Sequence, residues 1–194
     1  MADAVSPESD EQLVIRVQKG DKRSFDLLVL KYQHKVLALV RRFVRDHAEA
    51  EDVAQEAFIK AYRAIHGFRG DSAFYTWLYR IAVNTAKNAI DARKRRPGSD
   101  VDIDDIGEFA VSDSLKSEDS PESLLEAQDL QKVVEATLAS LPEDLRSALM
   151  LREFEGMAYE DIAHVMGCPI GTVRSRIFRA REAIDNAIKP LLES

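Results

Sequence analysis

The sequence predicts an all-α protein of two small helical domains joined by an acidic, flexible linker. Three observations carry this prediction. Apolar residues recur at three- and four-residue spacings on both sides of a central segment, which is the period of an amphipathic helix. Glycine and proline number only 8 and 6 among 194 residues. Residues 98–120 hold Gly, Ser and many Asp but few large apolar side chains, as linkers do. The predicted domains are therefore residues 1–97 and 121–194.

The first domain is expected to begin with mostly helical structure over residues 10–45, where Asp21 can cap a long amphipathic stretch. A second helix is predicted over residues 49–66. A glycine-containing break follows, and Asp71 or Ser72 can then cap a third helix.

The third helix, predicted at about residues 73–92, has a divided surface. Phe74 lies on its apolar face, whereas Arg80, Asn84 and Lys87 form a polar stripe on the opposite face. The aromatic side chains around it include Tyr75 and Tyr79, which fall away from the centre of the apolar face. Aromatic rings stack on unpaired bases and basic groups follow the backbone, so this segment suits single-stranded nucleic acid.

The second domain is expected to start with a helix at Pro121 and to continue with another from residues 141–143. Residues 159–184 then fit a helix-turn-helix. Ala163 is small where two helices cross, Gly167 can turn the chain with positive φ, and Val173 fills the space between the helices.

The second helix of this motif also has two sides when its residues are placed at 100° intervals. The inner sector holds Ile170, Val173, Ile177, Ala180 and Ile184. The outer side and its margins hold Thr172, Arg174, Ser175, Arg176, Phe178, Arg179 and Arg181. Arginine binds guanine edges or phosphates through paired hydrogen bonds, and an exposed Phe can touch a thymine methyl. The motif therefore predicts binding to duplex DNA.

The charge of the chain is unevenly distributed. Residues 97–143 contain thirteen acidic and two basic residues, a net −11, so the remainder carries +4 although the whole chain is −7. A positive remainder outside one acidic segment is compatible with nucleic-acid partners, which the net charge alone would disfavour.

Composition also limits the compartment and the chemistry. The lone Cys168 cannot form an internal disulfide, and the chain shows neither a signal peptide nor a run of about 18 apolar residues, so a cytoplasmic protein is expected. The histidines are scattered, and Asp100, Asp102 and Asp104 lack the Gly and Glu that complete a calcium loop. No catalytic site, metal site, cofactor or small-molecule substrate is expected.

Four segments together resemble one family: DVAQEAFIKAYRAI (residues 52–65), FRGDSAFYTWLYRIAVNTAKN (68–88), LPEDLR (141–146) and the helix-turn-helix. They are similar to the extracytoplasmic-function sigma factors of bacterial RNA polymerase, specifically the envelope-stress sigma-E or AlgU type. The resemblance covers about residues 10–192. It implies a non-enzymatic subunit with sigma regions 2 and 4, which directs transcription initiation at envelope-stress promoters.

The resemblance also implies three sets of site residues. Core RNA polymerase is expected to bind Asp52, Gln55 and Glu56, which from the residues alone are only polar positions on one helix. Recognition and melting of the −10 element, captured as a single strand, are expected at Phe68, Arg69, Ser72, Ala73, Phe74, Tyr75, Arg80, Asn84, Lys87 and Asn88. The duplex −35 element is expected to bind Thr172, Arg174, Ser175, Arg176, Phe178 and Arg179.

A further partner is implied by the resemblance alone. Proteins of this type are often held inactive by the cytosolic domain of a membrane-anchored anti-sigma factor, which binds between the two sigma domains. The alternative function is a stand-alone helix-turn-helix transcription regulator. Such a regulator would need a dimer interface or a sensor domain, and it would leave half of the chain without a role.

Overall fold

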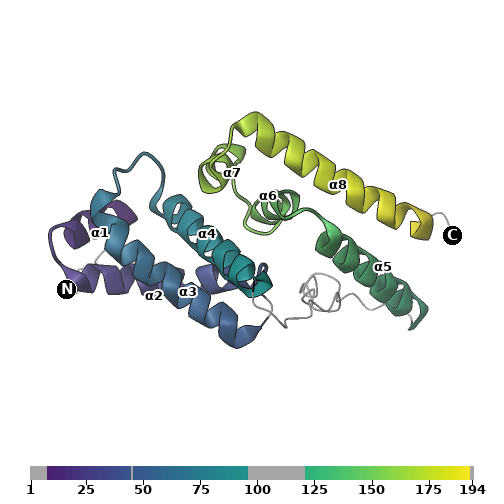
Figure 1. Ribbon diagram of the computed structural model, residues 1–194, viewed down its shortest axis with the longest axis horizontal. Coiled ribbons are helices and arrows are strands. Elements are labelled where there is room, and N and C mark those ends of the chain that lie inside the picture. The colour runs from purple at the N-terminus through teal and green to yellow at the C-terminus, as the bar shows by residue number, and fades with distance from the viewer. Residues whose placement is uncertain (1–7, 45, 96–120, 193–194) are drawn as a thin grey trace, which may run out of the picture. The chain divides into compact units, whose positions relative to one another are not determined.

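The computed structural model describes residues 8–44, 46–95 and 121–192, apart from the side chains of Lys94 and of residues 121–127. The linker predicted at residues 98–120 lies outside the described residues. The chain divides into two units, residues 1–99 and 100–194. Every regular element in the described ranges is a helix, which confirms the predicted all-α class (Figure 1).

The first unit is built around three helices that pack on one another. Its elements are α1 (Asp10–Gln18), α2 (Lys22–Arg41), α3 (His47–Ala64), the 3-10 turn η1 (Ile65–Gly67) and α4 (Phe74–Lys94). Helices α2, α3 and α4 contact one another, and α1 packs on α2 and η1 (Figure 1). The stretch predicted as mostly helical over residues 10–45 is thus two helices, separated by a turn.

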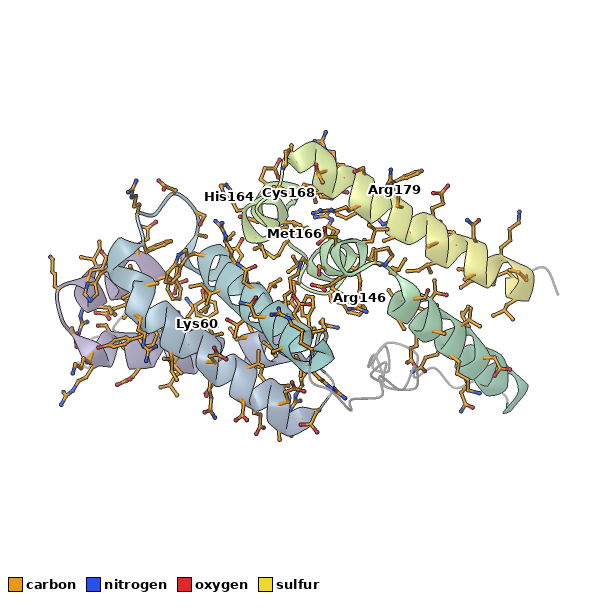
Figure 2. All side chains as sticks on the ribbon, in the orientation of Figure 1. Lys60, Arg146, His164, Met166, Cys168 and Arg179 are labelled. Atoms are coloured by element: carbon orange, nitrogen blue, oxygen red, sulfur yellow. The ribbon has the colours of Figure 1, made fainter. Side chains whose placement is uncertain are left out.

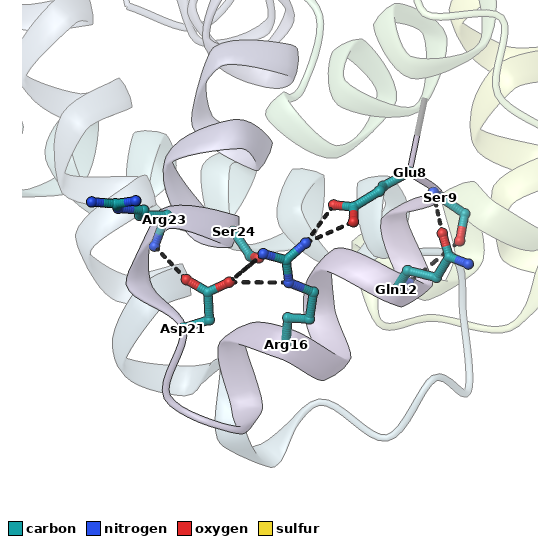
Figure 3. Close-up of polar contacts among 7 residues, drawn as sticks. All are labelled: Glu8, Ser9, Gln12, Arg16, Asp21, Arg23 and Ser24. Atoms are coloured by element: carbon teal, nitrogen blue, oxygen red, sulfur yellow. Dashed lines mark hydrogen bonds and ion pairs between the residues drawn. The ribbon is translucent and has the colours of Figure 1, made fainter. Parts of the chain in front are cut away.

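Paired polar side chains build the corner between α1 and α2 (Figure 3). Ser9 and Gln12 form a capping box that begins α1. Gly20 turns the chain with a φ of 98°, a conformation that favours glycine. Asp21 then accepts a backbone N–H of the first turn of α2, which confirms the predicted cap. The guanidinium of Arg16 donates to the same carboxylate at 3.0 and 2.6 Å and so joins the two helices.

Helix α4 begins without the predicted side-chain cap. Ala73 occupies the N-cap position and no side chain accepts a hydrogen bond there, so the expectation that Asp71 or Ser72 caps this helix is wrong. Burial holds the start of the helix instead, since Phe74 is only 5% exposed. Because α4 contacts both α2 and α3, its buried arc is wide enough to include Tyr79, which is 4% exposed.

The second unit is arranged along its longest helix. Its elements are α5 (Pro121–Ser140), α6 (Glu143–Glu153), α7 (Tyr159–Met166) and α8 (Ile170–Leu192). Helix α8 contacts α5, α6 and α7 (Figure 1). Side chains from all four helices form its core, among them Leu138, Met150, Leu151, Ile162, Val165, Val173 and Ile177. None of the helices in the described ranges has the length and hydropathy of a membrane span.

Candidate nucleic-acid interface

Helices α7 and α8 form the helix-turn-helix that the spacing predicted. Gly167 ends α7 in the left-handed conformation, with φ 63° and ψ 37°. The backbone N–H of Cys168 donates to the carbonyl of Ala163 at 3.1 Å and closes the last turn of α7. Val173 then inserts its side chain into the core and is 0% exposed. Gly167 and the buried Val173 thus set the orientation of α8 relative to α7.

One side of α8 is closed against the rest of its unit. Val173, Ile177 and Ala180 are buried, as their positions in the inner sector predicted. Ile170 and Ile184, at the margins of the contact, are half-buried. This side fixes how α8 lies on α6 and α7.

The opposite side of α8 is open. Arg174, Ser175 and Arg179 are exposed, and Phe178 is 67% exposed. Thr172 is half-buried beside them. Figure 2 labels Arg179 on α8 and Cys168 in the turn before it. Two guanidiniums, a hydroxyl and a large apolar ring are therefore available to a partner on one helical surface.

Arg176 differs from the other predicted contacts on α8. Its side chain is 22% exposed, and Nη2 donates to Oδ2 of Asp144 on α6 at 2.5 Å. Nη1 lies 3.3 Å from Sγ of Cys168. A guanidinium held in this way ties α8 to α6 and to the turn, and a contact with DNA would have to share it with Asp144.

Arg152, which the sequence analysis did not single out, lies beside the same tyrosine ring as Arg174, near the start of α8. The guanidinium of Arg152, on α6, is 4.9 Å from the ring centroid of Tyr159, and that of Arg174 is 6.0 Å from the same centroid. Arg152 also donates to the carbonyl of Met157 at 2.7 Å. No periodic signal could have revealed Arg152, because the contact joins α6 to α7 across a loop.

In the first unit, the exposed side of α4 combines amide and basic side chains. Arg80, Asn84 and Asn88 are exposed, and Lys87 is half-buried. Arg80, Lys87 and Asn88 each lie three or four positions from Asn84, so they lie close to it on the surface of the helix. Tyr75 is half-buried, and its ring meets that of Tyr79 edge to face at 6.1 Å. This face therefore pairs two amides, which can both donate and accept hydrogen bonds, with two cations, which can only donate.

The segment before α4, residues 68–73, forms a loop whose first residue packs on aromatic rings of α4. The ring of Phe68 lies 5.1 Å from that of Trp77 and 6.1 Å from that of Phe74. Arg69 and Ala73 are exposed and Ser72 is half-buried. The buried ring of Phe74 supports its neighbours, whereas the half-buried Phe68 and Trp77 retain accessible surface.

The residues predicted to bind polymerase lie together on α3. Asp52, Gln55 and Glu56 are all exposed. Glu56 pairs with Lys60 at 2.8 Å one turn later (Figure 2 labels Lys60). Ile59, three or four residues after Gln55 and Glu56, is 51% exposed and supplies an apolar centre to this face.

Comparison with protein-family models gives two matches. Sigma-70 region 2 matches residues 28–96, and Sigma-70, region 4 matches residues 131–184. The chain is 65% identical over 189 residues to the RNA polymerase sigma-H factor of Pseudomonas aeruginosa, covering 97% of this chain and 98% of the relative. It is 59% identical over 185 residues to the ECF RNA polymerase sigma-E factor of Escherichia coli strain K12, covering 95% and 96%.

Solved structures are similar over most of the chain. The sigma factor RpoE of Bartonella quintana, solved with the anti-sigma factor NepR, is 27% identical with a TM-score of 0.62, covering 86% of this chain and 98% of that one. CnrH, solved with the cytosolic domain of CnrY, is 24% identical with a TM-score of 0.67, covering 94% and 99%. The second likeness is one of fold.

Proposed function

The chain belongs to the extracytoplasmic-function group of the sigma-70 family, and we propose that it directs RNA polymerase to envelope-stress promoters through three separate surfaces. One observation carries the proposal. The side of α8 that bears Arg174, Phe178 and Arg179 is exposed, while its other side is closed within the domain. Such a helix can enter DNA without rearrangement of its own core.

The first surface is the exposed side of α8, which would lie in the major groove of the −35 element. The groove admits an α-helix, and an arginine there can bind guanine through O6 and N7. Arg174 and Arg179 are exposed and can do so, and Phe178 can contact a thymine methyl. Ser175 and Thr172 would add phosphate or base contacts. Arg176, held by Asp144, would act mainly by anchoring α8.

The second surface is the loop at residues 68–73 together with the polar face of α4, which would capture the melted −10 strand. Flipping a base out of a duplex costs a few kcal/mol. Stacking on an aromatic ring returns about 1–3 kcal/mol per base, which offsets that cost. Asn84 and Asn88 can pair with exposed base edges, and Arg80 and Lys87 can follow the backbone.

The third surface lies on α3 and would bind core polymerase. Asp52, Gln55 and Glu56 lie one to two turns before the exposed Ile59 on this helix. A small apolar centre within a polar rim is the usual anatomy of a protein interface. Ile59 is thus a candidate anchor that the sequence-based assignment omitted.

The three surfaces would act together. Polymerase holds the two domains at promoter spacing, so neither domain needs high affinity alone, because the attachment supplies effective concentration. We infer that the chain has no catalytic activity of its own and works in the cytoplasm, where polymerase and promoters meet. An anti-sigma factor with a cytosolic domain is the proposed inhibitor, by analogy with the complexes that similar sigma factors form.

Binding to purified core polymerase tests the proposal most simply. Asp52→Arg should weaken core binding about 10-fold, because it reverses a charge within the third surface. Asp26→Arg makes the same change at an exposed position on α2 and should leave binding within about twofold. A chain that recognises promoter DNA equally well without core polymerase would instead be a stand-alone regulator.

A further inference from the structure

Gln18, the last residue of α1, joins that helix to the segment that leads into the loop at residues 68–73. Its Nε2 donates to the carbonyls of Ile65 and Phe68, both at 2.9 Å. The backbone N–H of Phe68 also donates to the carbonyl of Ile65, at 3.1 Å. Gln18 therefore binds both ends of the η1 turn with one amide group.

Both sides of this contact are anchored. Ile65 is 0% exposed, so one of the two carbonyls belongs to the core. Gln18 is half-buried beside the buried Val17. Two residues earlier, Arg16 donates to Asp21 and fixes the end of α1 against the start of α2 (Figure 3). Gln18 thus presents its donors from a held position.

The loop depends on where this turn ends. Beyond the carbonyl of Phe68, the chain passes through Arg69, Gly70 at φ 77° and Ser72 before α4 begins. The ring of Phe68 packs on Trp77, so the side chain of Phe68 is held in place as well as its backbone carbonyl. A shift of the Phe68 backbone would therefore move the residues that are proposed to surround an unpaired base.

We propose that Gln18 is a positioning residue for promoter opening, which holds the loop at residues 68–73 in the geometry that captures the unpaired −10 strand. The proposal rests on the proposed function of that loop. It gives α1 a part in opening, although none of the three surfaces includes this helix. Holding a loop in its bound conformation improves affinity because less order is lost when the ligand binds.

The test compares Gln18→Met with Gln33→Met in the full-length chain bound to core polymerase. Methionine keeps the length of glutamine but has no donor, and Gln33 is a half-buried glutamine on α2. The readout is fluorescence anisotropy of a labelled single-stranded oligonucleotide that carries the −10 sequence. Gln18→Met should weaken its binding about 10-fold, and Gln33→Met should change it less than about twofold, with core affinity the same in both.

A second variant and a second readout separate positioning from general stability. Gln18→Glu keeps the shape but sets a carboxylate against two carbonyl oxygens, so it should weaken oligonucleotide binding at least as much. In the free chain, both variants should speed amide hydrogen exchange at residues 66–73 more than in α2 and α3. Exchange that rises evenly across the unit, or failure of both variants to fold, would show that Gln18 serves the core and would overturn the proposal.

Variants in the loop itself distinguish the proposed role of Gln18 from the proposed function of the loop. Arg69→Ala combined with Ser72→Arg changes the loop and leaves Gln18 in place. If this double variant binds the oligonucleotide as tightly as the unmodified chain does, the loop is not the −10 surface and the proposed function fails. If it loses binding while both Gln18 variants keep full affinity, only the positioning role of Gln18 is wrong.

Discussion

Helices α4 and α8 are both long, each with one buried and one exposed side, yet their exposed sides differ in chemistry. Helix α8 presents Arg174 and Arg179 beside one exposed ring, Phe178, and the guanidinium of Arg174 lies 6.0 Å from the ring centroid of Tyr159. Helix α4 presents two amides and two cations, those of Asn84, Asn88, Arg80 and Lys87. It follows a loop in which the ring of Phe68 packs on that of Trp77. Guanidiniums suit the charged, regular groove of a duplex, whereas rings and amides suit bases that have left the stack.

The contrast indicates a division of work between the two units. Contacts to phosphates and guanines bind DNA that is still paired and weaken as salt rises. Stacking on rings acts only after a base is unpaired and is less dependent on charge. A sigma factor needs both, because it must find a promoter before it opens it.

The largest effect is expected from removing both exposed arginines of α8. Arg174→Ala with Arg179→Ala should lower transcription from a −35-dependent promoter about 100-fold, since each paired contact with a base contributes about 1–3 kcal/mol. The control removes the same charge from α2 with Lys22→Ala and Arg23→Ala, both exposed. In vitro transcription at several salt concentrations measures the loss. An equal loss from the control pair would mean that bulk charge, rather than α8, accounts for recognition.

A smaller effect, about 10-fold, is expected from Asn84→Ala on a fully duplex template. The amide would contact the strand only after melting, so a pre-melted template should reduce the loss to about twofold or less. Asn186→Ala makes the same change at an exposed position near the end of α8. Transcription on the two templates gives the comparison. Equal loss on both templates would contradict a role for Asn84 in opening.

The smallest effect concerns Arg176, which the resemblance assigned to DNA and the structure pairs with Asp144. Arg176→Ala and Asp144→Ala should each lower the free energy of unfolding by about 1 kcal/mol, a modest value because Asp144 is about half exposed. Their effects should be less than additive, since both break one contact. Chemical denaturation of the single and double variants measures the coupling. Strict additivity would show that the pair does not stabilise α8.

The sequence predicted what is local and missed what joins distant segments. The burial of Val173 and Ile177 follows from helical periodicity, because residues three and four apart share a face in any amphipathic helix. The turn at Gly167 follows from the freedom of glycine at positive φ. These features require only the identities of neighbouring residues.

Long-range contacts carried no such signal. Arg176 meets Asp144 from 32 positions away, and Gln18 reaches Ile65 and Phe68 across 47 and 50 positions. Tyr79 falls away from the centre of the apolar face of a single helix, yet it is buried because α4 packs on two helices at once. The contacts that hold the candidate surfaces were therefore not predictable from the sequence, and the assignment of individual residues to DNA or polymerase stays a prediction.

The most direct test of the division between α4 and α8 is transcription by four forms of the holoenzyme on three templates. The forms are unmodified, Arg179→Ala, Asn84→Ala and the double variant, and the templates are complete, without a −35 element, and pre-melted at −10. We expect Arg179→Ala to have no effect on the template without a −35 element and to keep its effect on the pre-melted template. We expect Asn84→Ala to keep its effect on the template without a −35 element and to have little effect on the pre-melted template. If both variants lost their effects on the same template, the two helices would share one task and the account would be contradicted.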